Sequence, residues 1–377
     1  MILDLKYFDP TKHTVKVGDI DLIVGREEEC ERLRFISNYF NNVLITGKVG
    51  YGKTAMLHWA REFAYSNRLC VFVPESEKLR STYTYYYVLS KSLASALVHE
   101  YSKKISPLAF SYAKTILKSF ADKYKYTYAF FEGVLETLLN YLESENLLPV
   151  YFFIDDANYF SSKSENMMIM RDSFKSLMSV ERRYGFIMTM EYKALMKLYN
   201  EDPAFLDRFH VRIGLRNLSD EEVKELIRKR LLVARIDYEG DDEWFPFTED
   251  AVDYLAGEVD GVPRKALLLT RIVLEKFLAK HGGIISEDDR INLDFVSRTL
   301  RKAGMDTYSG VLQELGDKAV AIYNFIKMKG GSASFEDIMT GTGLSKPTTW
   351  RYLKELINLG YVEKKDRGIY SLTQEEP

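Results

Sequence analysis

One stretch of the sequence, residues 47–54, has the residue types and spacing that bind a nucleoside triphosphate. It reads GKVGYGKT and matches the phosphate-loop pattern of Gly, four residues, Gly, Lys and Ser or Thr. Its glycines allow left-handed backbone angles, so that backbone N–H groups approach phosphate oxygens without an intervening Cβ. We expect Lys53 to reach the β- and γ-phosphates and the Thr54 hydroxyl to ligate Mg²⁺.

An acidic pair, Asp155 and Asp156, follows the continuous apolar run VYFFI at residues 150–154. We expect this run to form a strand beside the phosphate-loop strand, with its acids at the carboxyl edge, where such sheets bind ligands. There Asp155 would hold Mg²⁺ through water, and Asp156 would polarise the attacking water. The alternative is a buried strand that ends in a solvated acidic turn.

The elements around these motifs predict an α/β fold. Residues 43–45 form an apolar run before the phosphate loop, and an apolar helical pattern follows it over residues 55–60. Further apolar runs at 69–73, 150–154 and 185–190 alternate with helical segments, which is typical of a parallel sheet covered on both faces. Residues 83–147 predict a packed helical pair that breaks near Pro107.

The pattern changes twice along the chain, which predicts three domains. Residues 1–217 are expected to form the α/β ATP-binding domain. Residues 218–303 read as helices only, the first of which begins with a capping box of Ser219 and Glu222. After a linker at 304–310, residues 311–377 read as three helices followed by a β-hairpin, the order of a winged helix-turn-helix.

Composition excludes several classes of protein. The 377 residues are 46% hydrophobic and 28% charged, as in ordinary globular proteins. With a net charge of −3, any nucleic-acid contact must come from a local basic patch. The two cysteines, Cys30 and Cys70, form no metal-binding pattern and suit a reducing compartment. The sequence shows neither a signal peptide nor a membrane-spanning run, so we expect a cytoplasmic protein without membrane contact.

In the order and rough spacing of its motifs, the chain resembles the AAA+ ATPases along about 300 residues. The matching segments are Gly25-Arg26-Glu27, GKVGYGKT, YFFIDD, Thr189 at a strand end, Arg208 in LDRFH and GVPR at 261–264. Within these ATPases, the terminal winged helix makes the chain most similar to the archaeal origin-recognition and helicase-loading proteins. The resemblance implies a P-loop AAA+ core, an all-helical lid, a winged helix, ATP or ADP as ligand, and Mg²⁺.

The resemblance also assigns roles to single residues. Thr189 would be a sensor of the γ-phosphate or of the water, Arg264 the sensor of the lid, and Arg208 a finger that reaches a neighbouring subunit of an oligomer. The set expected to contact nucleotide is Arg26, Gly47, Lys48, Val49, Gly50, Tyr51, Gly52, Lys53, Thr54 and Ala55. Thr189 and Arg208 could equally be an ordinary strand-end threonine and a surface arginine.

Two positions depart from the family pattern. Rapidly hydrolysing members usually carry Glu where this chain has Asp156, which is shorter by one methylene. Since a misplacement near 1 Å can lower a rate about 100-fold, we expect slow ATP hydrolysis, with nucleotide acting as a conformational switch. Tyr51 stands where a small residue is common, and the sequence gives no firm account of it.

The predicted winged helix carries a local excess of positive charge that favours duplex DNA as partner. Over residues 345–370, six basic residues stand against the three acidic residues Glu355, Glu363 and Asp366. We expect the second helix of the turn motif to enter the major groove and the wing to follow the backbone. The residues expected at DNA are Lys346, Thr348, Thr349, Arg351, Tyr352, Lys354, Lys364, Lys365 and Arg367. We expect Trp350 in the core, and protein docking is the alternative use of this domain.

Three functions remain open on the sequence. The favoured one is a DNA-binding AAA+ switch that acts in replication initiation or helicase recruitment through a partner protein. The second is a regulatory ATPase of the STAND type, in which the winged helix docks on the ATPase core. The third is a partner ATPase of a transposition or plasmid system.

Overall fold

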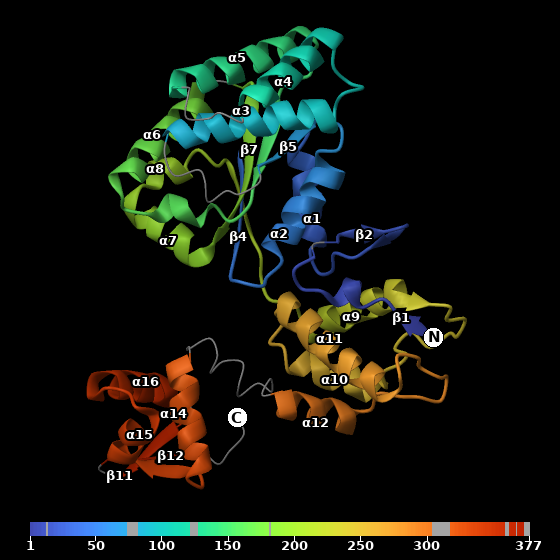
Figure 1. Ribbon diagram of the computed structural model, residues 1–377, viewed down its shortest axis with the longest axis vertical. Coiled ribbons are helices and arrows are strands. Elements are labelled where there is room, and N and C mark those ends of the chain that lie inside the picture. The colour runs from blue at the N-terminus through green and yellow to red at the C-terminus, as the bar shows by residue number, and fades with distance from the viewer. Residues whose placement is uncertain are drawn as a thin grey trace. The chain divides into compact units, whose positions relative to one another are not determined.

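The computed structural model describes residues 1–12, 14–73, 82–120, 127–180, 182–303, 317–358, 362–366 and 368–372. By its internal contacts the chain divides into two compact units (Figure 1). One unit comprises residues 3–235 and 260–268, and the other comprises residues 1–2, 236–259 and 269–377. The three domain limits expected from the sequence stay a prediction, and the expected linker at 304–310 lies outside the described residues.

The first unit contains a five-stranded parallel sheet in the order β5-β6-β7-β4-β8. Its strands are β4 (Val43–Gly47), β5 (Leu69–Val73), β6 (Val150–Ile154), β7 (Tyr184–Glu191) and β8 (Val211–Gly214). All neighbours pair in parallel, with Ile45 opposite Thr189 and Ile154 opposite Met188. The parallel sheet expected from the sequence is confirmed. The strand β6 is not beside the phosphate-loop strand β4, however, because β7 lies between them.

Helices cover both faces of this sheet because the strand residues pointing to either face are apolar. Leu44, Phe152 and Phe186 pack into one core, with α3 to α8. Val43, Ile45 and Phe153 pack into the other, with α1 and α2. These helices are α1 (Glu27–Ile36), α2 (Lys53–Trp59), α3 (Thr82–His99), α4 (Pro107–Ser119), α5 (Tyr128–Ser144), α6 (Glu165–Val180), α7 (Tyr192–Glu201) and α8 (Pro203–Leu206).

The stretch expected to form a helical pair contains α3, α4 and α5 instead. The break falls where Ser106 caps α4, with Pro107 in its first turn, and α5 then begins as a separate helix. Helix α3 packs against both α4 and α5. Together they lie over the same core as the sheet (Figure 1).

Short elements and α9 complete the first unit. The capping box that begins α9 (Asp220–Ala234) is confirmed, since the Ser219 hydroxyl accepts from the Glu222 N–H and the Glu222 carboxylate accepts from the Ser219 N–H. The other short elements are β2 (Lys16–Val17), β3 (Ile20–Asp21), the 3-10 helices η1 (Leu5–Phe8) and η5 (Ala157–Ser161), and the π-helical turn η2 (Ala60–Ala64). The strands β1 (Ile2–Leu3) and β9 (Arg235–Ile236) each have one residue in either unit.

The second unit contains the remaining helices and a small sheet. Its helical part comprises α10 (Glu249–Gly257), most of α11 (Pro263–Lys280) and α12 (Leu293–Ala303). The winged helix follows with α14 (Asp317–Met328), β10 (Ser332–Ser334), α15 (Phe335–Thr342), α16 (Lys346–Asn358), β11 (Val362–Asp366) and β12 (Ile369–Leu372). Its antiparallel sheet has the order β10-β12-β11.

The winged helix encloses a hydrophobic core of its own. Ile322, Ile338, Leu353, Leu356 and Tyr370 are among the buried residues that form it. The three helices and the sheet thus confirm the winged helix-turn-helix expected from the sequence. None of the helices in the described part of the chain combines the length and the apolar character that crossing a membrane requires.

Candidate functional site

The phosphate loop folds around the ammonium group of Lys53. Lys53 Nζ donates hydrogen bonds to the carbonyl oxygens of Gly47, at 3.2 Å, and of Lys48, at 3.0 Å. Its side chain is buried, and burial lowers the pKa of this ammonium below its usual value, against the raising effect of nearby Asp156 and Glu191. The loop therefore holds its one buried cation at the start of α2, where the helix dipole also favours an anion.

Two glycines of the loop adopt backbone angles that other residues rarely reach. Gly50 has φ of 84° and Gly52 has φ of 89°. A Cβ at Gly50 would lie 2.9 Å from Val262 Cγ1, so Gly50 is also required by the close approach of residues 262–264. A Cβ at Gly52 would meet nothing within 4 Å. The space beside Gly52, at the N-terminus of α2, is therefore not filled by other atoms of the protein.

Asp155 links the phosphate loop to Thr189 on the next strand of the sheet. Its carboxylate accepts a hydrogen bond from Thr54 Oγ1 at 2.8 Å and another from Thr189 Oγ1. Thr189 Oγ1 in turn accepts from the backbone N–H of Asp156 at 2.8 Å. Because β7 lies between β4 and β6, Thr189 stands between the two motifs and joins them. This arrangement brings together Thr54, Asp155 and Thr189, three of the residues singled out in the sequence.

A cavity of about 230 Å³ opens beside this network. At its polar end lie Lys53, Thr54, Asp156, Glu191 and Arg264. Burial raises the pKa of the Asp156 carboxyl, and the negative charge of Asp155 raises it further. Glu191 was missed by the sequence analysis. The signal for it was its position two residues after Thr189, because alternate strand residues share a face.

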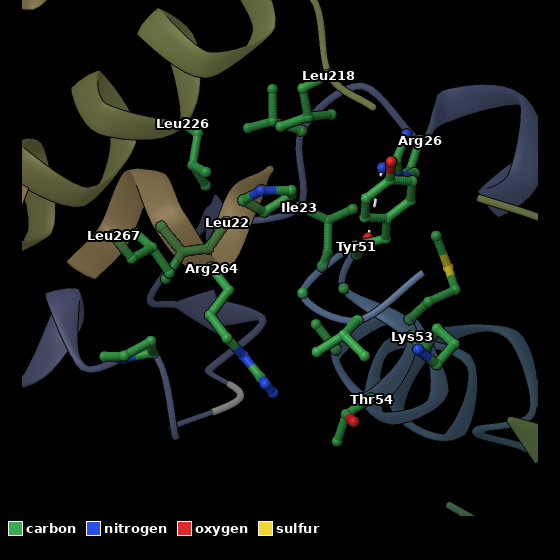
Figure 2. Close-up of a pocket in the computed structure, with 18 of the residues that line it drawn as sticks. Leu22, Ile23, Arg26, Tyr51, Lys53, Thr54, Leu218, Leu226, Arg264 and Leu267 are labelled. Carbon is green, nitrogen blue, oxygen red and sulfur yellow. Dashed lines mark hydrogen bonds between the residues drawn. The ribbon is translucent and has the colours of Figure 1, made fainter. Parts of the chain in front are cut away.

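The other end of the cavity carries mainly apolar side chains, with Arg26 beside them (Figure 2). It is lined by Leu22, Ile23, Leu218, Leu226 and Leu267, which come from three segments far apart in the sequence. Each of these is an ordinary apolar residue, and none carries a motif. A cavity with apolar side chains at one end and the cations Lys53 and Arg264 at the other suits a ligand that is apolar at one end and anionic at the other.

Two residues expected to contact nucleotide also support the wall of the cavity. Arg26 is 5% exposed and donates to the carbonyl oxygens of Gly25, at 3.0 Å, and of Arg216, at 2.5 Å. It also donates to the Tyr51 carbonyl oxygen at 3.4 Å. The ring of Tyr51 packs into the core formed with α1 and α2, which accounts for a large residue at this place in the loop. Both residues still line the cavity.

The two arginines expected to act as lid sensor and finger lie in different surroundings. The backbone N–H of Arg264 donates to the Gly50 carbonyl oxygen at 3.2 Å, and its side chain extends into the cavity toward the level of Thr54 (Figure 2). Arg208 is not among the residues that line the cavity. Its carbonyl oxygen accepts from Asn42 Nδ2 at 3.3 Å.

The residues expected to hold Mg²⁺ fit a hard cation. Thr54 and Asp155 offer hydroxyl and carboxylate oxygens, the ligand atoms that Mg²⁺ prefers. Within the described residues there is no group of three or more His, Cys, Asp or Glu side chains able to hold a metal ion. The remaining ligands would therefore be phosphate oxygens and water, as is usual for Mg²⁺ at nucleotide sites.

The winged helix presents most of its expected basic residues to solvent. Lys346, Arg351 and Lys354 are exposed on α16, and Lys364 and Lys365 are exposed on β11. Arg367 lies outside the described residues. The Thr348 hydroxyl pairs with the Ser345 hydroxyl at 2.8 Å, and Tyr352 is half-buried with the Arg351 guanidinium 4.5 Å from its ring centre.

Two expectations about α16 were wrong. Thr349 is fully buried, and its hydroxyl donates to the Ser345 carbonyl oxygen at 3.1 Å, so its side chain has no donor to offer DNA. Trp350, expected in the core, is 56% exposed, with the Lys354 ammonium 5.4 Å from its ring centre. The inward face of α16 carries Thr349, Leu353 and Leu356, at the spacing of a helical stripe, and Trp350 falls one residue outside it.

Two sequence comparisons agree with this description. Residues 317–366 match the IclR helix-turn-helix domain family. The chain is also similar to an uncharacterized HTH-type transcriptional regulator of Methanocaldococcus jannaschii. The two are 26% identical over 394 residues, which cover 99% of this chain and 92% of that protein.

Two solved structures share the fold over nearly the full chain. The ORC2 protein of Aeropyrum pernix, in ADPNP-ADP complexes, is 15% identical with a TM-score of 0.55, and the match covers 100% of this chain and 95% of that one. The ORC1 protein of Aeropyrum pernix in complex with DNA is 16% identical with a TM-score of 0.53, covering 98% and 93%. The fold expected from the resemblance, a P-loop AAA+ core followed by a winged helix, is thereby confirmed.

Proposed function

We propose that this protein binds ATP and Mg²⁺ in the cavity at the phosphate loop, hydrolyses ATP slowly, and binds duplex DNA through its winged helix. The observation that carries the ATP site is the Asp155 carboxylate, which accepts from both Thr54 and Thr189. Such a link between the phosphate loop and a strand-end threonine positions a magnesium ligand and a sensor together. When bound, Mg²⁺ would neutralise charge on the phosphates.

The other residues of the cavity take separate roles in this proposal. Lys53 and the backbone N–H groups of residues 48–55 would bind the phosphates, and the apolar end would enclose the base. Asp156 would polarise the attacking water, and Arg264 would sense the γ-phosphate. Arg208, which does not line the cavity of its own chain, would serve a neighbouring subunit in an oligomer.

Lengthening Asp156 by one methylene is expected to raise the rate of ATP hydrolysis. The variant Asp156→Glu restores the side chain that rapidly hydrolysing AAA+ proteins carry, and its longer reach should bring the carboxylate closer to the water. The measurement is phosphate release at saturating ATP, with Asp172→Glu, an exposed acid on α6, as control. If Asp156→Glu bound ATP normally and hydrolysed it no faster, side-chain length would not explain slow turnover.

DNA binding is supported by the exposed basic residues of α16 and β11, and by the match to a helix-turn-helix family. The double variant Lys346→Glu with Arg351→Glu should weaken binding to duplex DNA by about 100-fold, and lower the slope of log affinity against log salt by about 1 to 2. An electrophoretic shift at several salt concentrations measures both. Lys318→Glu with Lys327→Glu makes the same charge change on α14, where both lysines are exposed, and should bind as the unchanged protein does.

The same experiment tests the nucleotide switch and the alternative function. We expect the affinity for DNA to differ between ATP and ADP, because nucleotide is proposed to control the DNA-binding state. If the unchanged protein bound no DNA with ATP, with ADP or without nucleotide, a STAND-type regulatory ATPase would be favoured instead.

The process served by DNA binding is a second part of the proposal. A role in replication initiation, with recruitment of a helicase or other replication protein, is supported by the fold shared with ORC1 in complex with DNA. Transcriptional regulation is supported by the similarity to the uncharacterized HTH-type transcriptional regulator of Methanocaldococcus jannaschii. Mapping the sites that the protein occupies in its own genome separates the two, since replication origins are expected for the first and promoters for the second.

A further inference from the structure

Trp350 on α16 is a large apolar side chain that the winged helix leaves in contact with solvent. It is 56% exposed, whereas Trp59 is fully buried and Trp244 is half-buried. Trp350 is also not one of the residues that form the hydrophobic core of the winged helix or pack against it. Because contact between water and so large an apolar surface is unfavourable, the position of Trp350 suggests a binding partner.

The side chains around Trp350 on the surface of α16 are positively charged. Lys346 and Lys354 stand four residues before and after it, so both are its neighbours on the helix surface, and Arg351 follows it directly. All three cations are exposed, and among the residues that the structure describes no carboxylate forms an ion pair with them. Glu355, the one acid in the sequence of α16, lies about 140° around the helix from Trp350. This face therefore suits a polyanion.

Trp350 also stands in the part of the motif that reads bases. Helix α15 ends at Gly343, which has φ of 67°, and α16 begins two residues after this turn residue's neighbour Leu344, at Lys346. Residues 317–366, which include both helices, match a helix-turn-helix family. In such motifs the N-terminal residues of the second helix contact base edges in the major groove. Trp350 is the fifth residue of this second helix.

We propose that Trp350 enters the major groove of duplex DNA and packs its ring against the 5-methyl group of a thymine. This inference rests on the proposed function of the winged helix as a DNA-binding domain. The methyl group of thymine is the apolar group that base pairs present in the major groove, and apolar side chains recognise it there. Trp350 thus supplies a preference for sequence, whereas Lys346, Arg351 and Lys354 supply attraction to the phosphates.

Replacing Trp350 by alanine tests its contribution to affinity. The probe is the duplex that the full-length protein selects most tightly from a random pool, and an electrophoretic shift at several salt concentrations is the measurement. Trp350→Ala should bind this duplex about tenfold more weakly, with the slope of log affinity against log salt unchanged, because no phosphate contact is lost. Met328→Ala is the matched control, since it removes an 86% exposed apolar side chain from α14 and should bind as the unchanged protein does.

Removing single methyl groups from the duplex tests the contact with thymine. Each thymine is replaced in turn by deoxyuridine, which lacks only the 5-methyl group. The unchanged protein should bind about fourfold more weakly when one particular thymine is replaced, which corresponds to the loss of one buried methyl group. Trp350→Ala should bind the two forms of that duplex equally, and Met328→Ala should distinguish them.

Fluorescence reports on Trp350 directly. Contact with DNA bases quenches the emission of an indole ring, so the selected duplex should quench the unchanged protein. Trp350→Phe keeps an aromatic ring and should still bind the duplex, but it should lose the quenching, because Trp59 and Trp244 lie outside the winged helix. Circular dichroism confirms that each variant is folded.

The outcomes separate this inference from the function on which it rests. If the unchanged protein bound DNA, but Trp350→Ala bound equally tightly or no thymine methyl group affected affinity, base recognition by Trp350 would be wrong and DNA binding would stand. If the unchanged protein bound no DNA with ATP, with ADP or without nucleotide, the proposed function itself would be wrong, and this face of α16 would suit an acidic protein instead.

Discussion

Replacing Lys53 by alanine should weaken ATP binding by about 30-fold to several thousand-fold. Lys53 is buried, and its ammonium group already donates to two carbonyl oxygens of the phosphate loop, at 3.0 and 3.2 Å. Removing one partner of a buried, hydrogen-bonded charge pair costs about 2 to 5 kcal/mol, and each 1.4 kcal/mol is about tenfold in affinity. Here Lys53 is the partner removed, and the phosphates would be the partner left behind.

Calorimetry with ATP, on protein freed of nucleotide, measures this effect. Two further variants make the result specific. Lys53→Met keeps most of the apolar stem and should lose affinity as Lys53→Ala does, which shows that the charge and not the packing is responsible. Lys197→Ala removes an exposed lysine of α7 and should leave affinity unchanged. Normal ATP binding by folded Lys53→Ala would contradict the site assignment.

Replacing Asp155 by asparagine should remove the dependence of ATP binding on Mg²⁺ and lower hydrolysis by about 10- to 100-fold. Asparagine has nearly the same shape as aspartate, and a hydroxyl group can accept as well as donate. The contacts with Thr54 and Thr189 can therefore persist in the variant, with one of them reversed. The negative charge that would favour Mg²⁺ is what the variant loses.

The measurement is ATP affinity with and without Mg²⁺, together with phosphate release. Without Mg²⁺, Asp155→Asn should bind ATP within a few-fold of the unchanged protein, which distinguishes it from Lys53→Ala. Asp172→Asn, at an exposed acid on α6, is the matched control and should change neither quantity. If Asp155→Asn kept its response to Mg²⁺, the ion would not be held at Asp155.

The sequence by itself determined the parts of the site that depend on local spacing. The phosphate loop could be identified because its function requires glycines, a lysine and a hydroxyl within one turn between strand and helix. The capping box at Ser219 and Glu222 was equally local, since both hydrogen bonds join residues three apart. The strands followed from unbroken apolar runs, which reflect burial of both faces of the sheet, and the helices followed from a period of 3.6 residues, which reflects burial of one face.

Only the tertiary structure decided which of these parts meet. Strand order is set by pairing between segments far apart in the chain, so the sequence placed β6 beside β4, whereas β7 lies between them and brings Thr189 to Asp155. The apolar end of the cavity had no local signal, because each of its residues becomes distinctive only through neighbours from other segments. On α16, the packing of one helix face buried Thr349 and exposed Trp350, since a shift of one residue moves a side chain by about 100° around a helix.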